Sequence, residues 1–214
     1  MKAQDRALIK ALMVDVDGVI VVHPHPSGWA YKIEEDLGLS RNLLQQEFFD
    51  KHWPDILLGR ARLHDRLAPV LAEIAPHLSS ESLTAYWFKE DAHLDRDLLR
   101  QLAALRDEGF EIHLATVQDH ARAAYLWTDL GLRDCCDAMH YAAALGCAKP
   151  DPAFFQRIEE RTGLEGTELF FIDDKVSNID AARACGWNAA LWTGRRRLLD
   201  LMAENGVPIQ NLRR

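Results

Sequence analysis

A chain of 214 residues is long enough for one α/β domain with a sizeable insertion, or for two small domains. Apolar residues make up 48% of the sequence and charged residues 27%, which is the ordinary balance of a soluble globular protein. Because the formal net charge is -8, we expect neither nucleic acid nor an anionic membrane as a partner, and an anionic ligand needs cations placed close to it.

The N-terminal residues and the cysteines bear on where the protein works. The first apolar run is interrupted by Asp15 and Asp17 and has no small-residue cleavage site, so it does not resemble a signal peptide. No stretch reaches the ~18 consecutive apolar residues that a membrane-spanning helix needs. The four cysteines fit neither a disulfide framework nor the spacing of zinc ligands. We therefore expect a cytoplasmic protein.

Alternating strand and helix patterns predict the fold class. Short apolar runs rich in β-forming residues predict buried strands at residues 11–14, 110–115, 138–142, 169–172 and 189–192. Helical patterns lie between the later runs, at residues 95–108, 119–130, 152–162 and 176–185, with Asp119 and Asp151 as expected N-caps. This alternation predicts an α/β fold with a doubly wound, Rossmann-like parallel sheet.

Residues 22–93 depart from this alternation, because they show helical patterns and turns but no convincing strand. We predict that they form a small helical cap domain, inserted into an α/β core domain made of residues 1–21 and 94–214. Open α/β sheets bind ligands at the carboxyl ends of their strands, and the insertion follows the first strand directly, so the cap should overhang the ligand site. His23 and His25, at its start, either face a substrate or lie in a hinge, and we favour the hinge.

Two acidic pairs follow predicted strands. Asp15 and Asp17 come directly after the first strand, and Asp173 and Asp174 come after the fourth. The carboxyl ends of parallel strands meet at one edge of a sheet, so these like charges would repel one another without a cation. Mg²⁺ binds carboxylate oxygens and recruits substrate phosphate. Each pair alone also fits a solvated turn, and the same Asp-x-Asp spacing recurs at Asp95, where we expect a helix cap.

Two further polar residues belong to the same edge. Thr116 closes the second predicted strand, and its hydroxyl group could donate to a phosphoryl oxygen or cap the helix that follows. Lys149 precedes the helix predicted at residues 152–162, where its ammonium group either reaches the same edge or lies in solvent, as most lysines do. The position of both residues in the series favours a shared site.

This series resembles a known family. It is similar, in order, to the four motifs of the haloacid dehalogenase-like (HAD) hydrolase superfamily, with counterparts in Asp15-Val-Asp-Gly-Val19, Thr116, Lys149-Pro150, and Phe171-Ile-Asp-Asp174 with Asn178. The insertion between the first two motifs resembles the helical cap of the C1, subfamily IA-like phosphatase branch, whose members mostly act on small phosphorylated molecules. One departure is Val117, where the family often has Asn, which affects the positioning of groups near the phosphate.

The resemblance implies a mechanism and a role for each residue. Asp15 is the expected nucleophile, which forms an aspartyl-phosphate, and Asp17 is the expected general acid and base. Thr116 and Lys149 are expected to bind the substrate phosphate. The backbone carbonyl of Asp17 is one way for that residue to bind metal. The expected magnesium ligands are Asp15, Asp17, Asp173 and Asp174, and Asp174 binds the ion either directly or through a water molecule. The predicted activity is Mg²⁺-dependent hydrolysis of a phosphate monoester of a small metabolite.

Other classes share some of these features. Response-regulator receivers also combine an acidic pair, a phosphoacceptor Asp, a hydroxyl residue and a Lys, but their acidic pair comes near the start, whereas Asp173 and Asp174 come last. The dehalogenase branch of the superfamily does not use the second Asp, so Asp17 favours phosphate chemistry, and a phosphomutase is a further alternative. A catalytically silent interaction protein would not explain polar groups at so many strand ends. The sequence predicts neither the substrate's identity nor the oligomeric state.

Overall fold

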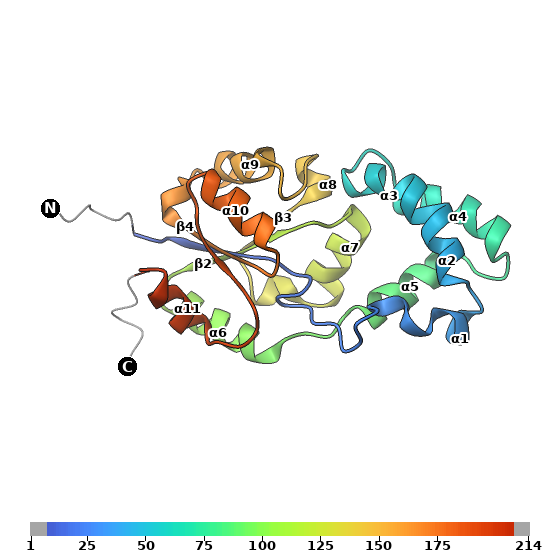
Figure 1. The fold of residues 1–214 in the computed structure, drawn as a ribbon, viewed down its shortest axis with the longest axis horizontal. Helices are drawn as coiled ribbons and strands as arrows, with labels where there is room; N and C mark the ends of the chain where they lie inside the picture. The colour runs from blue at the N-terminus through green and yellow to red at the C-terminus, as the bar shows by residue number, and fades with distance from the viewer. Residues whose placement is uncertain (1–7, 208–214) are drawn as a thin grey trace, which may run out of the picture.

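The computed structural model describes residues 8–207. Residues 1–7 and 208–214 lie outside the described residues. The start of the N-terminal segment that does not resemble a signal peptide, and both ends of the predicted core domain, are among them. Figure 1 shows an α/β unit at one end of the molecule and a group of helices at the other. Among the helices between residues 8 and 207, none combines the length and the hydropathy that crossing a membrane requires.

The α/β unit is built on a sheet whose strands all run parallel, as the sequence predicts. Within residues 8–207 the strands are β1 (Ala11–Val14), β2 (Glu111–Thr116), β3 (Ala138–Tyr141), β4 (Leu169–Asp173) and β5 (Asn188–Leu191). Their order across the sheet is β3-β2-β1-β4-β5, and every neighbouring pair is parallel. The chain winds outward from β1 to β3 and then returns to the other side of β1 for β4 and β5, which confirms the doubly wound fold.

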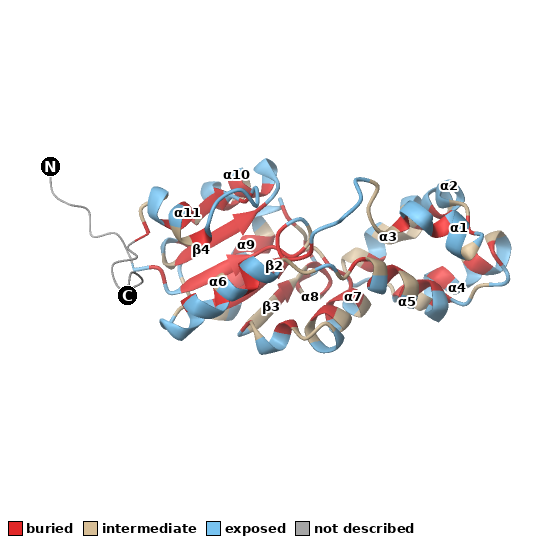
Figure 2. Ribbon diagram, turned by 90° about the horizontal axis from the view of Figure 1, so that it is seen from below, coloured by how far each residue is buried: buried red, intermediate tan, exposed pale blue. Residues whose placement is uncertain are grey.

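Helices cover both faces of the sheet, because successive side chains of a strand point to opposite faces. On β1, Leu12 and Val14 pack against one layer of helices, and Ala11 and Met13 pack against the other. The first layer contains α6 (Arg96–Asp107), η3 (Tyr125–Asp129), which continues α7 (His120–Ala124), and α11 (Leu198–Glu204). The second layer contains α9 (Pro152–Thr162) and α10 (Val176–Ala184). Figure 2 shows β2 and β4 largely buried between these layers, and the edge strands β3 and β5 are less buried.

The helices follow the sequence prediction with a few differences. Asp119 and Asp151 are N-caps as predicted, since each side chain accepts hydrogen bonds from the first turn of its helix. The predicted helix at residues 119–130 is not one regular helix, because it changes to a π-helical turn at Tyr125. Short elements are absent from the prediction, because they carry too little periodicity to be recognised. They are η4 (Leu132–Asp134), α8 (Ala142–Leu145), η5 (Gly166–Glu168) and α11.

In the described chain, residues 29–90 form the second group of helices and contain no strand, as the sequence predicts. The elements are η1 (Trp29–Lys32), α1 (Ile33–Leu37), α2 (Arg41–Leu44), η2 (Gln45–Phe49), α3 (Asp50–Leu57), α4 (Leu63–Ile74) and α5 (Ser80–Glu90). They bury a hydrophobic core of their own, in which the rings of Trp29, Phe49 and Trp53 pack around Trp87. This core is separate from the two that lie against the sheet.

A buried ion pair joins the helical segment to the α/β unit. Arg122 on α7 is 1% exposed, and its Nη2 lies 3.1 Å from Oδ2 of Asp91, which follows α5. The guanidinium group also donates to the backbone carbonyls of Phe88 and Asp91, and it lies over the rings of Phe88 and Tyr125. The chain crosses between the two units twice, once near His23 and once near Asp91. At the first crossing, Nδ1 of His23 lies 3.0 Å from Oδ1 of Asp91. The two crossings therefore meet at Asp91, which favours the hinge interpretation of His23.

Replacing Arg122 with Leu is expected to lower the free energy of unfolding by about 3 to 5 kcal/mol, because the buried carboxylate of Asp91 loses its cation. Urea denaturation at neutral pH measures this change. Adding Asp91→Asn should recover part of the loss, since the uncompensated charge is then removed. The control is Arg133→Leu, because the ion pair of Arg133 is exposed and contributes little. A loss no larger than that of the control would contradict the role of this pair.

Candidate active site

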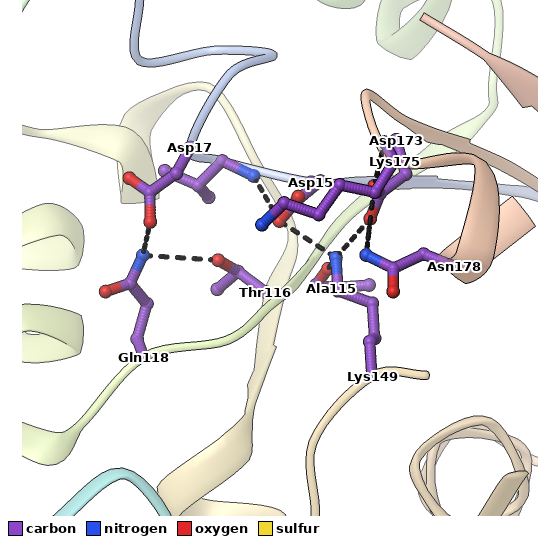
Figure 3. A network of polar contacts seen from close by, with 10 residues as sticks. Asp15, Asp17, Ala115, Thr116, Gln118, Lys149, Asp173, Lys175 and Asn178 are labelled. Carbon is purple, nitrogen blue, oxygen red and sulfur yellow. Dashed lines mark hydrogen bonds and ion pairs between the residues drawn. The ribbon is translucent and has the colours of Figure 1, made fainter. Parts of the chain in front are cut away.

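The carboxyl ends of three neighbouring strands bring most of the predicted site residues together. Asp15 follows β1 directly, Thr116 ends β2, and Asp173 ends β4. Because β1 lies between β2 and β4, these residues meet at one edge of the sheet, where the direction of winding reverses. Lys149 reaches the same edge from the loop that precedes α9. Figure 3 shows the resulting network of polar contacts.

Lys149 lies at the centre of this network. Its side chain is buried, and its Nζ lies 2.9 Å from Oδ1 of Asp15 and 2.6 Å from Oδ2 of Asp173. It also donates to the backbone carbonyl of Ala115 at 2.8 Å, so that each of the three N–H groups of the ammonium has an acceptor. One cation therefore links the ends of β1, β2 and β4.

The carboxylate of Asp173 is held from several sides. Nδ2 of Asn178 lies 3.0 and 2.9 Å from its two oxygens, and the backbone N–H of Lys175 donates to Oδ1 at 2.8 Å. Burial acts to raise the pKa of Asp173, but Lys149 and these donors outweigh burial, and the pKa lies below its usual value. Asp173 is therefore ionised at neutral pH.

The pKa of Asp15 is shifted in the opposite direction from that of Asp173. It is 4% exposed, and its Oδ1 accepts hydrogen bonds from the backbone N–H of Val16, at 2.8 Å, and from Lys149. Burial raises the pKa of Asp15 to about 7, and the charge of Asp173 adds to this rise while Lys149 opposes it. Two carboxylates beside one ammonium group leave an excess of negative charge. Such a site is stabilised by a further cation.

The carboxylates at this edge could share a metal ion. Asp15, Asp173 and Asp174 each offer one oxygen, and these three oxygens lie within 4.8 Å of one another. Burial raises the pKa of Asp174, and the neighbouring charge of Asp173 acts in the same direction. A donor set made only of carboxylate oxygens suits Mg²⁺, so the residues present fit this ion. Among the described residues, the group does not include the carboxylate of Asp17, the fourth predicted ligand.

The carboxylate of Asp17 is held at the end of β2 instead. Its Oδ2 accepts a hydrogen bond from Nε2 of Gln118 at 2.6 Å, and the same nitrogen lies 3.3 Å from Oγ1 of Thr116. Gln118 is not among the residues expected from the sequence, where its position two residues after Thr116 is the only signal. The predicted residues thus form two linked sets, one around Lys149 and one around Gln118.

Gly18 lies in the turn that directly follows Asp15 and Asp17. Its φ of +85° lies in the left-handed region, which favours glycine. An added Cβ would lie 2.4 Å from Oδ2 of Asp174, so any larger residue would displace that carboxylate. The turn after β1 and the position of Asp174 therefore both require glycine at this place.

The doubly wound parallel sheet, with carboxylates and a lysine gathered at its switch point, is typical of Rossmann-like α/β proteins. A sequence profile of the haloacid dehalogenase-like hydrolases matches residues 9–186, which is more than half of the chain. The chain therefore belongs to the haloacid dehalogenase-like hydrolase family. This finding confirms the resemblance seen in the motifs and excludes the receiver-domain alternative.

Three relatives illustrate the relationship. The mouse haloacid dehalogenase-like hydrolase domain-containing protein 3 is 25% identical over 181 residues, which are 82% of this chain and 66% of the mouse protein. Phosphatase MT3486 of Mycobacterium tuberculosis is 37% identical over 60 residues, or 28% of each chain. A HAD family enzyme from Bacteroides thetaiotaomicron, solved with magnesium and inorganic phosphate, has a TM-score of 0.76 at 18% identity, over 90% of this chain and 98% of that one. This structural likeness shows the shared fold.

The raised pKa of Asp15 predicts a pH-dependent stability of the metal-free protein. Between about pH 4 and 7 the folded state holds a proton that the unfolded chain releases. The stabilisation from this proton is fully present below about pH 4 and is lost as the pH rises through about 7. Asp15→Asn cannot ionise, so its free energy of unfolding, relative to that of the wild type, should rise across this window and then level off. Denaturant unfolding in EDTA measures this difference, and a difference independent of pH would contradict the raised pKa.

Proposed function

We propose that the protein is a Mg²⁺-dependent phosphohydrolase that cleaves the phosphate monoester of a small metabolite through an aspartyl-phosphate on Asp15. The observation that carries this proposal is the buried ammonium group of Lys149, which bonds to both Asp15 and Asp173 at the switch point of the sheet. Phosphoryl transfer needs a positioned nucleophile, a fixed cation beside it and oxygens that hold a metal. The magnesium and inorganic phosphate in the Bacteroides neighbour support the same chemistry.

Asp15 is the proposed nucleophile. The backbone N–H of Val16 and the ammonium group of Lys149 both bond to its Oδ1, so they fix the carboxylate and leave Oδ2 for the attack on phosphorus. The attack forms an oxygen–phosphorus bond and breaks the ester bond, and water then hydrolyses the aspartyl-phosphate. One difficult displacement is thereby divided into two easier ones.

Thr116 and Lys149 are the proposed phosphate-binding residues. The hydroxyl group of Thr116 is buried at the end of β2, within the network that includes Asp17. All three N–H groups of Lys149 already have acceptors, so a contact with a phosphoryl oxygen requires that one of these bonds be exchanged. Even without that exchange, the buried ammonium group stabilises the negative charge of the transferring group.

We assign magnesium binding to the carboxylates of Asp15, Asp173 and Asp174, whose oxygens converge. For Asp17 we assign the backbone carbonyl, because its carboxylate is held by Gln118. A bound Mg²⁺ would supply charge that offsets the carboxylates and polarises the phosphoryl oxygens.

Asp17 is the proposed general acid and base. Among the described residues its carboxylate bonds to Gln118, whereas Lys149 pairs with Asp15 and Asp173, so Asp17 is not committed to an ion pair with that lysine. It would protonate the leaving alkoxide and then accept a proton from the attacking water. This role fits hydrolysis of a phosphate ester better than cleavage of a carbon–halogen bond.

We propose that residues 22–93 act as a cap domain over a core domain formed by residues 1–21 and 94–214. The helical segment has its own hydrophobic core. It also touches the α/β unit away from the chain crossings, since an added Cβ at Gly59 would lie 2.4 Å from the carbonyl oxygen of Ala143. A cap in this position would exclude water and contribute to the choice of substrate.

The direct test is a phosphatase assay on a panel of phosphorylated metabolites and on 4-nitrophenyl phosphate. We expect turnover with Mg²⁺, loss of turnover in EDTA, and recovery when Mg²⁺ is restored. Asp15→Asn should lose on the order of 10³-fold or more in kcat, because the nucleophile is removed. The control Asp97→Asn changes an exposed carboxylate and should keep full activity. Full activity of Asp15→Asn, or turnover in EDTA, would overturn the proposal.

Asp17→Asn is expected to lower kcat by roughly 10²- to 10⁴-fold, the usual contribution of general acid–base catalysis. The Mg²⁺ concentration for half-maximal activity should change little, because the substitution leaves the backbone carbonyl in place. Titration of the residual activity with Mg²⁺ measures this concentration. A loss of Mg²⁺ affinity as large as the loss in kcat would make the Asp17 carboxylate a metal ligand.

A further inference from the structure

We propose that Gln118 is a positioning residue, whose side-chain amide holds the carboxylate of Asp17 in place for proton transfer to the leaving group. The inference rests on the proposed phosphohydrolase function and assigns a role to a residue outside the four motifs.

The contacts of Gln118 are specific. It is 4% exposed, and its Nε2 donates to Oδ2 of Asp17 at 2.6 Å. The same nitrogen donates to Oγ1 of Thr116 at 3.3 Å, so both hydrogens of the amide are directed at residues of the site. The backbone of Gln118 is fixed as well, because its carbonyl accepts a hydrogen bond from the N–H of Ala143 at 3.1 Å. Figure 3 shows Gln118 between Asp17 and Thr116.

The two oxygens of Asp17 are in different situations. Oδ2 is held by Gln118, whereas Oδ1 is buried and has no hydrogen-bond partner among the described residues. A buried oxygen without a partner is unfavourable, so this oxygen is available to a hydrogen-bond partner that a bound substrate brings. Gln118 therefore anchors one oxygen and leaves the other to exchange a proton with the leaving group.

The same amide also orients Thr116. Because the hydroxyl oxygen of Thr116 accepts a hydrogen bond from Gln118, its own hydrogen is directed elsewhere and can be donated to a phosphoryl oxygen. Gln118 thus couples the residue proposed to bind the phosphate with the residue proposed to protonate the leaving group.

A series of aryl phosphates with leaving groups of rising pKa, from 4-nitrophenyl to phenyl phosphate, tests this role. A good leaving group needs little protonation, so a misplaced acid matters most for the poor ones. In Gln118→Met, which keeps the chain length but has no donor, we expect kcat/KM to fall less than about 10-fold for 4-nitrophenyl phosphate and roughly 10- to 100-fold for phenyl phosphate. Gln118→Glu, which is isosteric but faces Asp17 with a carboxylate, should show the same steeper dependence and covers the case in which the first variant does not fold.

A double-mutant cycle separates positioning from a structural role. If Gln118 acts through Asp17, Gln118→Met should add nothing to the leaving-group dependence of Asp17→Asn. The control is Gln45→Leu, because Gln45 donates to Asp50 at 2.7 Å on the exposed surface of the helical segment, and it should behave like the wild type.

The outcomes distinguish the two proposals. A loss of the same size on every ester, or a leaving-group dependence in the double variant steeper than that of Asp17→Asn alone, would overturn the role of Gln118 and leave the phosphohydrolase proposal intact. If the wild-type protein with Mg²⁺ hydrolysed none of the esters, the proposed function would fail, and the role of Gln118 would fail with it.

Discussion

The arrangement of the site depends on one buried ammonium group. β1 and β4 are hydrogen-bonded neighbours in register up to Val14 and Ile172, so Asp15 and Asp173 must come side by side where these strands end. Both carboxylates are buried, and two like charges out of water repel each other strongly. Lys149 lies between them and satisfies both, while its third hydrogen bond extends to β2. The sheet can therefore keep two acidic residues where its geometry forces them together.

Much of this edge could be predicted from the sequence, because a parallel sheet brings the carboxyl ends of its strands together. Asp15, Thr116 and Asp173 each stand where a buried apolar run ends, and the structure brings them together on neighbouring strands. The Asp-x-Asp copy at Asp95 is a helix cap, as its polar context indicates. Lys149 lies in a loop, and its place in the ordered series of motifs is what marks it.

Other features depend on contacts that no local pattern contains. The bond between Gln118 and Asp17 joins residues that are 101 positions apart, and Arg122 meets a carbonyl 31 positions away. The sequence groups Asp17 with Asp15, but β1 ends at Val14 and a turn begins at Val16, so the alternation of an extended strand does not continue to Asp17. Members of the haloacid dehalogenase-like family often have Asn where this chain has Val117. In this structure the side-chain amide beside Thr116 belongs to Gln118.

The way the helical segment joins the sheet has a consequence for how such a chain can vary. The two crossings run side by side, with the N–H of Val22 bonded to the carbonyl of His93 and the N–H of Asp95 bonded to the carbonyl of Ile20, each at 2.8 Å. The helical segment therefore leaves and rejoins the α/β unit at nearly the same point, so its length does not affect the spacing of the strands. The sheet could accept a module of quite different size at this junction, and evolution could exchange one for another while the chemistry beneath stayed unchanged.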